Sequence, residues 1–221
     1  MLEQNLYTRE ELLWMRQEVA SQNKTLSPDL VDFICKKDWL NVGTPHKNKS
    51  FPWNAREIAS LFEALSYVDG SLGWVVNLGA GANLFLAFLE PDYVAELQEN
   101  PKLWFAGSGA ISGKAIKENE GYRISGYWKY ASGANYATHF TCNAYLYDGE
   151  TPIVNEKGEP VFKSFVVPAS HVKIQDTWKT IGLRASGSHD FEIKEVLLPE
   201  KACFEISKDA VHVSNPLYEM S

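Results

Sequence analysis

The chain has 221 residues, of which 45% are hydrophobic and 13% aromatic, so it is long enough and apolar enough to bury a sizeable core. Its 21 basic and 28 acidic residues give a formal net charge of −7 without a long block of one sign, which argues against a nucleic-acid groove or a polybasic membrane patch. We therefore expect small molecules, and copies of the chain itself, as its partners.

Cysteine and histidine usage gives no sign of a disulfide framework or a metal site. The three cysteines are far apart and odd in number, and the five histidines show no ligand spacing. The amino terminus is amphipathic and acidic, unlike a signal peptide, and no run of about 18 apolar residues predicts a membrane span. We expect a cytoplasmic protein. The residues concerned are Cys35, Cys142, Cys203, His46, His139, His171, His189 and His212.

Apolar residues recur at helical spacing through the first hundred residues. Ser27 before Pro28 predicts a helix start, because Ser caps helices and Pro suits the first helical position. Further helices are predicted over 53–68, with a stop at Asp69-Gly70, over an apolar and buried 73–88, and over about 90–99. Residues 1–100 are therefore predicted to form a helical domain.

After Pro101 the pattern changes to alternating β-branched and aromatic residues separated by turn residues. A hairpin turn is predicted at 119–121, between strands that end near 116 and begin at 122. Strands are also predicted over 139–147, 161–167 and 191–198. Residues 101–200 thus predict a small β-barrel or sandwich, with 201–221 as a tail, and the fold class is α+β.

The stretch 105–140 combines small residues with an aromatic segment, which suits a flat, hydrogen-bonding aromatic ligand. Glycines there let the backbone approach a ligand, and serines add hydroxyl groups. Trp128 and Tyr130, two apart on a predicted strand, are expected on one face, where they would wall a planar ring. The alternative interpretation of this stretch is a pair of turn-rich hairpins whose aromatic residues belong to the core and bind no ligand. The small residues are Gly107, Gly109, Gly113, Ser108, Ser112 and Ser132.

Three blocks of the sequence, in the same order, resemble the acyl-CoA dehydrogenase superfamily of flavoproteins. They are the helix-pair segment 66–85, the strand segment 105–140 and the run DTWKTIGLRASGSHDFEIKEVLLPE over 176–200. The family's usual Thr-Glu-Pro after the first strand of the β-domain is replaced here by residues 106–109. In this segment the sequence more closely resembles the flavin monooxygenase and hydroxylase branch of the superfamily.

The resemblance implies a flavin-dependent oxidoreductase of the acyl-CoA dehydrogenase type that binds FAD or FMN. One alternative is a monooxygenase or hydroxylase that uses reduced flavin and O₂, and another is a noncatalytic flavin-binding or assembly module. The substrate would be an acyl-CoA or an aromatic compound. No segment matches the family's carboxy-terminal helical bundle, so no catalytic base is assigned, and a homo-oligomer or a complementing chain is expected to complete the site.

The resemblance also implies site residues. Ser132 is expected beside the flavin ring, where its hydroxyl would polarise the ring, with a turn serine bonded to the backbone as the alternative. His189 is a candidate acid or base, with a surface histidine as the alternative. The expected cofactor-binding residues are Gly107, Ser108, Gly109, Trp128, Tyr130, Ser132 and Gly133, and the expected substrate-binding residues are Asp69, Trp74, Asn77, Ser188 and His189.

Overall fold

The computed structural model describes residues 6–21, 24–44, 53–213 and 218, so His46 lies outside the described residues. The first half is helical, as predicted. Its α-helices are α1 (Arg9–Ser21), α2 (Pro28–Lys36), α3 (Ala55–Val68), α4 (Gly70–Asn83) and α5 (Pro91–Leu97), and α4 continues into the 3₁₀ helix η3 (Leu84–Phe88).

Side-chain caps explain where these helices begin. Ser27 accepts a hydrogen bond from the Leu30 amide and caps α2, as the sequence predicted. Asn54 and Glu57 form a reciprocal capping box at α3. Asp69 ends α3 in an extended conformation, and its carboxylate accepts from two amides of the first turn of α4, so the two helices follow each other directly.

The second half forms one mixed sheet with the strand order β6-β7-β2-β1-β3-β5-β8, in which β1 and β3 run parallel and the other neighbours antiparallel. The α+β class and the turn between β1 and β2 are confirmed. The pairing follows an open path, so it does not confirm a closed barrel. The strands are β1 (Phe105–Glu118), β2 (Gly121–Ala131), β3 (His139–Asp148), β4 (Thr151–Pro152), β5 (Phe162–Pro168), β6 (Lys173–Gln175), β7 (His189–Pro199) and β8 (Cys203–Phe204).

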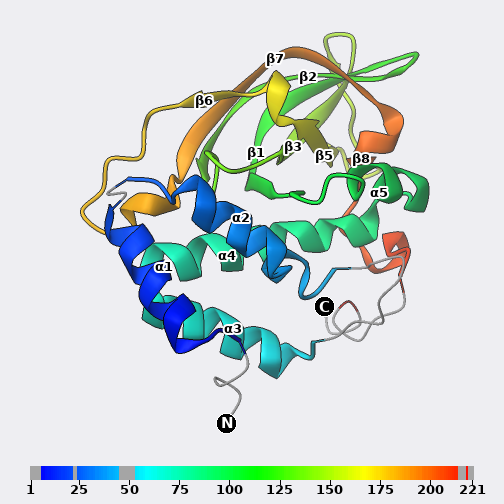
Figure 1. The fold of residues 1–221 in the computed structure, drawn as a ribbon. Coiled ribbons are helices and arrows are strands. Elements are labelled where there is room, and N and C mark those ends of the chain that lie inside the picture. Colours follow the sequence, from blue (N-terminus) through cyan, green and yellow to red (C-terminus); the bar gives the residue numbers. More distant parts are fainter. Residues whose placement is uncertain (1–5, 22–23, 45–52, 214–217, 219–221) are drawn as a thin grey trace.

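Helix α4 lies between the sheet and α3 (Figure 1). Its buried side, which includes Leu72, Val75 and Val76, joins the core of the helical part. A second hydrophobic cluster fills the space enclosed by the sheet and includes residues of η3 and α5. Helix α4 contacts β1, which lies in the middle of the sheet between β2 and β3.

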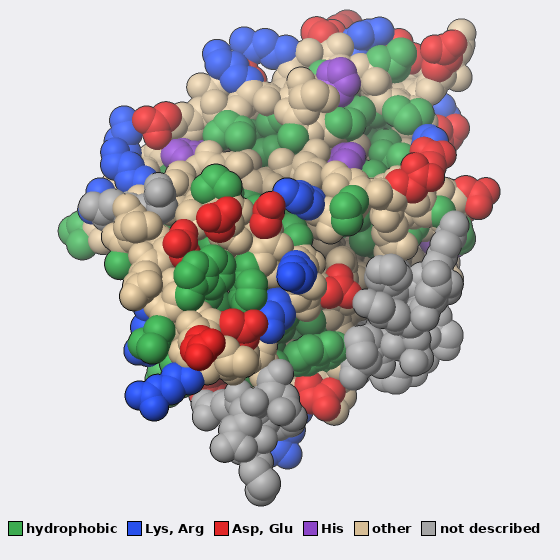
Figure 2. Space-filling model, viewed as in Figure 1, with side chains coloured by type: hydrophobic (Ala, Val, Ile, Leu, Met, Phe, Trp, Pro, Cys, Tyr) green, Lys and Arg blue, Asp and Glu red, His purple; other side chains and the backbone are tan. Residues whose placement is uncertain are grey.

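By length and composition alone, residues 70–88 could cross a membrane. However, 56% of that apolar window is buried inside the fold, and a core helix gives the same signal. The absence of a membrane span therefore stays a prediction. Acidic and basic side chains are interspersed on the face shown in Figure 2, in keeping with the mixed charge pattern of the sequence.

Candidate functional site

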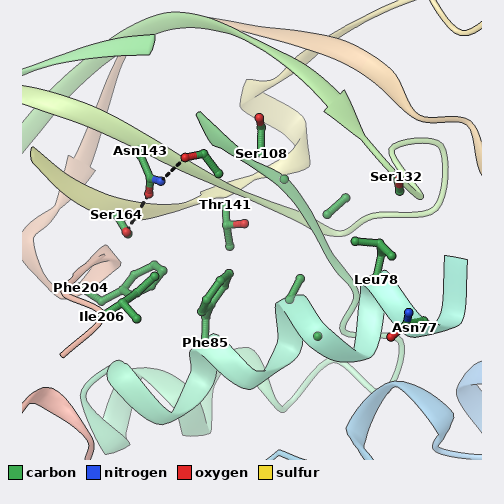
Figure 3. A pocket seen from close by; sticks show the side chains of 15 residues that line it. Asn77, Leu78, Phe85, Ser108, Ser132, Thr141, Asn143, Ser164, Phe204 and Ile206 are labelled. Atoms are coloured by element: carbon green, nitrogen blue, oxygen red, sulfur yellow. Dashed lines mark hydrogen bonds between the residues drawn. The ribbon is translucent and has the colours of Figure 1, made fainter. Parts of the chain in front are cut away.

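A cavity of about 380 Å³ lies between α4 and the sheet, and we call it the α4 cavity (Figure 3). Helix α4 and η3 contribute Asn77, Leu78, Gly81, Ala82 and Phe85, while β1 contributes residues 106–109. Ser132, Thr141, Asn143, Ser164, Phe204 and Ile206 complete the lining. None of these described lining residues carries a charge, so the cavity suits an uncharged ligand.

Ser132 lies at one end of the α4 cavity, within a chain of hydroxyl groups. The Trp74 indole nitrogen donates to Ser132 Oγ at 2.9 Å, and Ser132 Oγ lies 2.8 Å from Ser188 Oγ, which is itself 2.8 Å from Ser186 Oγ. If Ser186 donates to Ser188 and Ser188 to Ser132, the Ser132 hydroxyl keeps its own proton for a ligand. The structure therefore brings three expected site residues, Trp74, Ser132 and Ser188, into one network.

Tyr130 stands next to this network with its ring exposed. It has φ = 64°, a left-handed conformation that is uncommon for a residue other than glycine, and 67% of the residue is exposed. The Asp190 carboxylate accepts from its amide at 3.2 Å, and the Trp178 ring stands edge-on to it at 6.3 Å between centroids. The strained backbone thus presents an aromatic ring to the surface beside Ser132.

The expectation that Trp128 and Tyr130 share a face is wrong. The register of β2 against β7 shifts between Trp128 and Ala131, so the two-residue alternation is broken at Tyr130. Trp128 is fully buried, stacks on Phe191 at 5.2 Å, and donates to the backbone carbonyl of Asn143. It is a core residue and lines neither the cavity that contains Ser132 nor the one that contains His189.

The glycines of the sequence motif have different roles. A Cβ on Gly113 would lie 2.3 Å from the Trp128 ring, so this glycine makes room for the core and not for a ligand. Gly107 lines the α4 cavity, but a Cβ there would meet Thr141 at 2.1 Å, so it also serves the pairing of β1 with β3. Ser108 and Gly109 line the cavity, and a Cβ on Gly109 would meet open space.

Gly133 follows Ser132 at φ = 80°, and its amide donates to the Ser186 carbonyl at 2.8 Å. Asn77 lines the α4 cavity, and its expected contact with a substrate stays a prediction. Asp69 does not line this cavity, because its carboxylate caps α4 and it borders a separate depression with Arg16, Ser71 and Leu183. The expected substrate role of Asp69 is therefore replaced by a helix-capping role.

His189 belongs to a second cavity of about 510 Å³, which we call the basic cavity. Its lining includes Lys24, Lys179 and Arg184 with a single carboxylate, Asp176. His189 Nδ1 accepts from the Trp178 amide at 3.2 Å, which leaves Nε2 to hold the proton of a neutral ring. Asp176 lies 3.9 Å from the same nitrogen, too far for a hydrogen bond.

Sequence reasoning missed Phe85, Thr141, Asn143, Ser164, Phe204 and Ile206, which line the α4 cavity. Two signals were available. Phe85 lies on the stripe 74, 78, 81, 85, whose spacing puts these residues on one side of a helix. Thr141 and Asn143 are polar residues at alternate positions of a strand that is otherwise apolar or aromatic until it ends at Asp148.

The side chains present fit a flavin without any metal, and no metal-ligand cluster occurs within the described part of the chain. Ser132 offers a hydroxyl proton and Tyr130 an exposed aromatic face beside an uncharged cavity. Tyr130 also contacts Trp178, which lines the basic cavity, where three cationic side chains suit phosphate. A planar ring that carries a phosphate group matches this arrangement, in which an aromatic face and a hydroxyl group lie next to a basic cavity.

The helical part, the mixed sheet and the cavity between them are consistent with an acyl-CoA dehydrogenase-like fold. XiaF from Streptomyces sp., solved in complex with FADH2 and glycerol, superposes with a TM-score of 0.81 at 25% identity, over 94% of this chain and 52% of that protein. No protein-family model matches the chain.

Two curated relatives are similar in sequence. The indole-3-acetate monooxygenase of Acinetobacter baumannii is 30% identical over 195 residues, covering 88% of this chain and 48% of the relative. The oxygenase component of the FADH(2)-dependent resorcinol hydroxylase of Rhizobium sp. is 35% identical over 158 residues, covering 70% and 37%. The chain thus spans about half the length of the Acinetobacter baumannii relative and a smaller share of the length of the Rhizobium relative.

The two curated relatives are named as a monooxygenase and as an FADH(2)-dependent hydroxylase, and XiaF was solved with FADH2. They support the monooxygenase alternative better than the dehydrogenase that the sequence suggested first. The resemblance to a flavoprotein superfamily is therefore supported in its monooxygenase branch, and acyl-CoA oxidation is not supported.

Proposed function

We propose that the chain forms the flavin-binding and substrate-binding part of a monooxygenase that uses reduced flavin and O₂ to hydroxylate a small aromatic substrate. The observation that carries the proposal is the Ser132 hydroxyl network at the end of an uncharged cavity. A bound reduced flavin would supply two electrons to O₂, so that one oxygen atom enters the substrate and the other leaves as water.

In this proposal the flavin ring lies against Ser132 and Tyr130, outside the α4 cavity. The Ser132 hydroxyl donates to an acceptor atom of the ring, while Trp74 and Ser188 hold Ser132 in place. The phosphate of the flavin nucleotide enters the basic cavity near Arg184 and Lys179. FAD and FMN both carry the phosphate that this cavity would bind.

The substrate occupies the α4 cavity, where it faces the flavin ring from the Ser132 end. The names of the two curated relatives, an indole-3-acetate monooxygenase and a resorcinol hydroxylase, favour an aromatic substrate over an acyl-CoA. The second name also describes an oxygenase component, which supports a separate reductase that delivers reduced flavin.

The proposed flavin surface is open to solvent on one side. Tyr130 is exposed there, and Trp74 and Leu78 are partly exposed on α4. A dry site is needed to keep reduced flavin from unproductive reaction with O₂. We therefore propose that a second copy or a complementing chain covers this side.

The test is turnover of an aromatic probe. The protein is mixed anaerobically with FADH₂ or FMNH₂ and with resorcinol or indole, O₂ is added, and products are measured by mass spectrometry. A gain of one oxygen atom in the probe, reduced in Ser132→Ala and retained in the distant Ser21→Ala, is the expected result. Flavin binding with no oxygenated product would favour the noncatalytic module instead.

A further inference from the structure

One hydroxyl in the α4 cavity has no partner within the described part of the chain. Thr141 is only 6% exposed and lines the cavity, yet its side chain makes no hydrogen bond to any described residue. The neighbouring polar groups differ, because Ser164 Oγ donates to Asn143 Oδ1 at 2.7 Å and Asn143 Nδ2 donates to the Gly109 carbonyl at 2.9 Å. The Thr141 oxygen is not fully enclosed by the described residues, so it is open to the cavity, where a bound molecule can supply its hydrogen bond.

The packing of β1 against β3 keeps this hydroxyl unobstructed. Gly107 pairs with Thr141, and a Cβ on Gly107 would lie 2.1 Å from Thr141 Oγ1. In Figure 3 the Thr141 side chain projects from β3 toward Phe85, into the space between the strand and the helix. The hydroxyl is therefore available to a molecule in the cavity.

The surroundings of Thr141 define the chemistry of that molecule. Phe85 and Phe204 lie 5.5 Å apart between ring centroids, and Ile206 completes an apolar end of the cavity. A planar aromatic ring packs well against such side chains. Because the described lining carries no charge, an ionised carboxylate or ammonium group would be buried here without compensation.

Size sets a further limit. A cavity of roughly 150 Å³ holds a single benzene ring, so the 380 Å³ here accommodates one or two fused rings.

We propose that Thr141 marks a substrate subsite, in which its hydroxyl binds a phenolic hydroxyl or a ring N–H of a neutral aromatic molecule with one or two rings. This inference rests on the proposed function, since it assigns the substrate class to the same cavity. Thr141 selects and orients the ring in the cavity. It takes no part in the chemistry at the flavin.

The experiment compares two probes of the same bicyclic shape, indole with its N–H and benzothiophene without it, by calorimetric titration of the 221-residue chain. Thr141→Val should lower indole affinity about threefold to tenfold, the value of one hydrogen bond, and leave benzothiophene affinity unchanged. Thr141→Ser, which retains a hydroxyl, should keep the preference for indole. Thr151→Val, an exposed site on β4, is the matched control.

A stability measurement separates recognition from a structural role. Since the Thr141 hydroxyl has no described partner, Thr141→Val should leave the melting temperature unchanged or raise it, whereas loss of a structural hydrogen bond would lower it. An unchanged ratio of indole to benzothiophene affinity in Thr141→Val overturns the subsite, as does failure of the wild-type chain to bind either probe.

The two proposals fail separately. If the chain binds reduced flavin but its preference for indole over benzothiophene does not depend on Thr141, the subsite is rejected and the monooxygenase proposal is kept. A Thr141-dependent preference for indole without any flavin binding would reject the monooxygenase and keep the subsite.

Discussion

Trp74 on α4 and Ser132 after β2 are 58 residues apart in the chain, and the Trp74 indole nitrogen donates a 2.9 Å hydrogen bond to the Ser132 hydroxyl. The bond joins the helical part to the sheet at the end of the α4 cavity. Because Ser132 Oγ accepts this hydrogen bond, one of its lone pairs is occupied, and this restricts the directions in which the hydroxyl proton can point. The proposed flavin contact depends on this arrangement.

Ser132→Ala should weaken reduced-flavin binding about threefold to tenfold, because one hydrogen bond to the ring is lost. Trp74→Phe should weaken it less, since Ser132 stays but loses its orienting donor. Fluorescence titration under anaerobic conditions measures both. Ser21→Ala is the control, since the Ser21 hydroxyl donates to the Glu18 carbonyl on α1. Equal affinity in Ser132→Ala and in the wild type would remove Ser132 from the site.

Tyr130→Asn should lower flavin affinity while changing the free energy of unfolding by less than about 1 kcal/mol, because asparagine tolerates the left-handed backbone that Tyr130 adopts. Tyr67→Asn is a matched control, since Tyr67 is 70% exposed on α3, against 67% for Tyr130. Urea denaturation and flavin titration on both variants supply the comparison. A loss of stability without loss of affinity in Tyr130→Asn would make Tyr130 a structural residue.

The sequence predicted the fold class and most element positions because capping and alternation are local signals. Ser27 and the turn after β1 are examples. Trp128 and Tyr130 show where such reasoning stopped, because the β2 register shift depends on pairing with β7, a strand some sixty residues further on. The strand pattern marks Thr141 as a polar residue, but the lack of a described partner for its hydroxyl is a property of the packed cavity, which the sequence does not show.

Trp128→Ala should lower the free energy of unfolding by about 3–5 kcal/mol, as expected for removal of a large buried side chain. Trp128→Phe, which keeps an aromatic ring in the core, should be milder and should leave flavin affinity unchanged. Gly113→Ala should also destabilise the fold, because the added Cβ would meet the Trp128 ring. If flavin affinity fell in a well-folded Trp128→Phe variant, the assignment of Trp128 to the core would be incomplete.

The free energy of unfolding should decrease as the pH falls below the ordinary histidine pKa, because of His139 at the start of β3. Burial lowers the pKa of His139 from 6.5, so between its two pKa values the unfolded chain binds a proton that the folded protein does not. This contribution to stability is fully present above pH 6.5 and is lost as pH falls toward the folded-state value.

Denaturation of His139→Gln at about pH 7.5 and about pH 5.5 tests this, because the variant should lose less stability between the two conditions than the wild type. His171→Gln, at an exposed position, should behave as the wild type does. Identical pH dependence in His139→Gln and the wild type would contradict the expected role of His139.

Anaerobic titration of the 221-residue chain with FADH₂ and with FMNH₂ tests the flavin site most directly, since it presumes neither a substrate nor a partner. We expect saturable binding of at least one reduced flavin, weakened by Ser132→Ala and by Tyr130→Asn and unchanged by Ser21→Ala. Absence of saturable binding for both flavins would contradict the proposal that this chain holds the flavin of a monooxygenase.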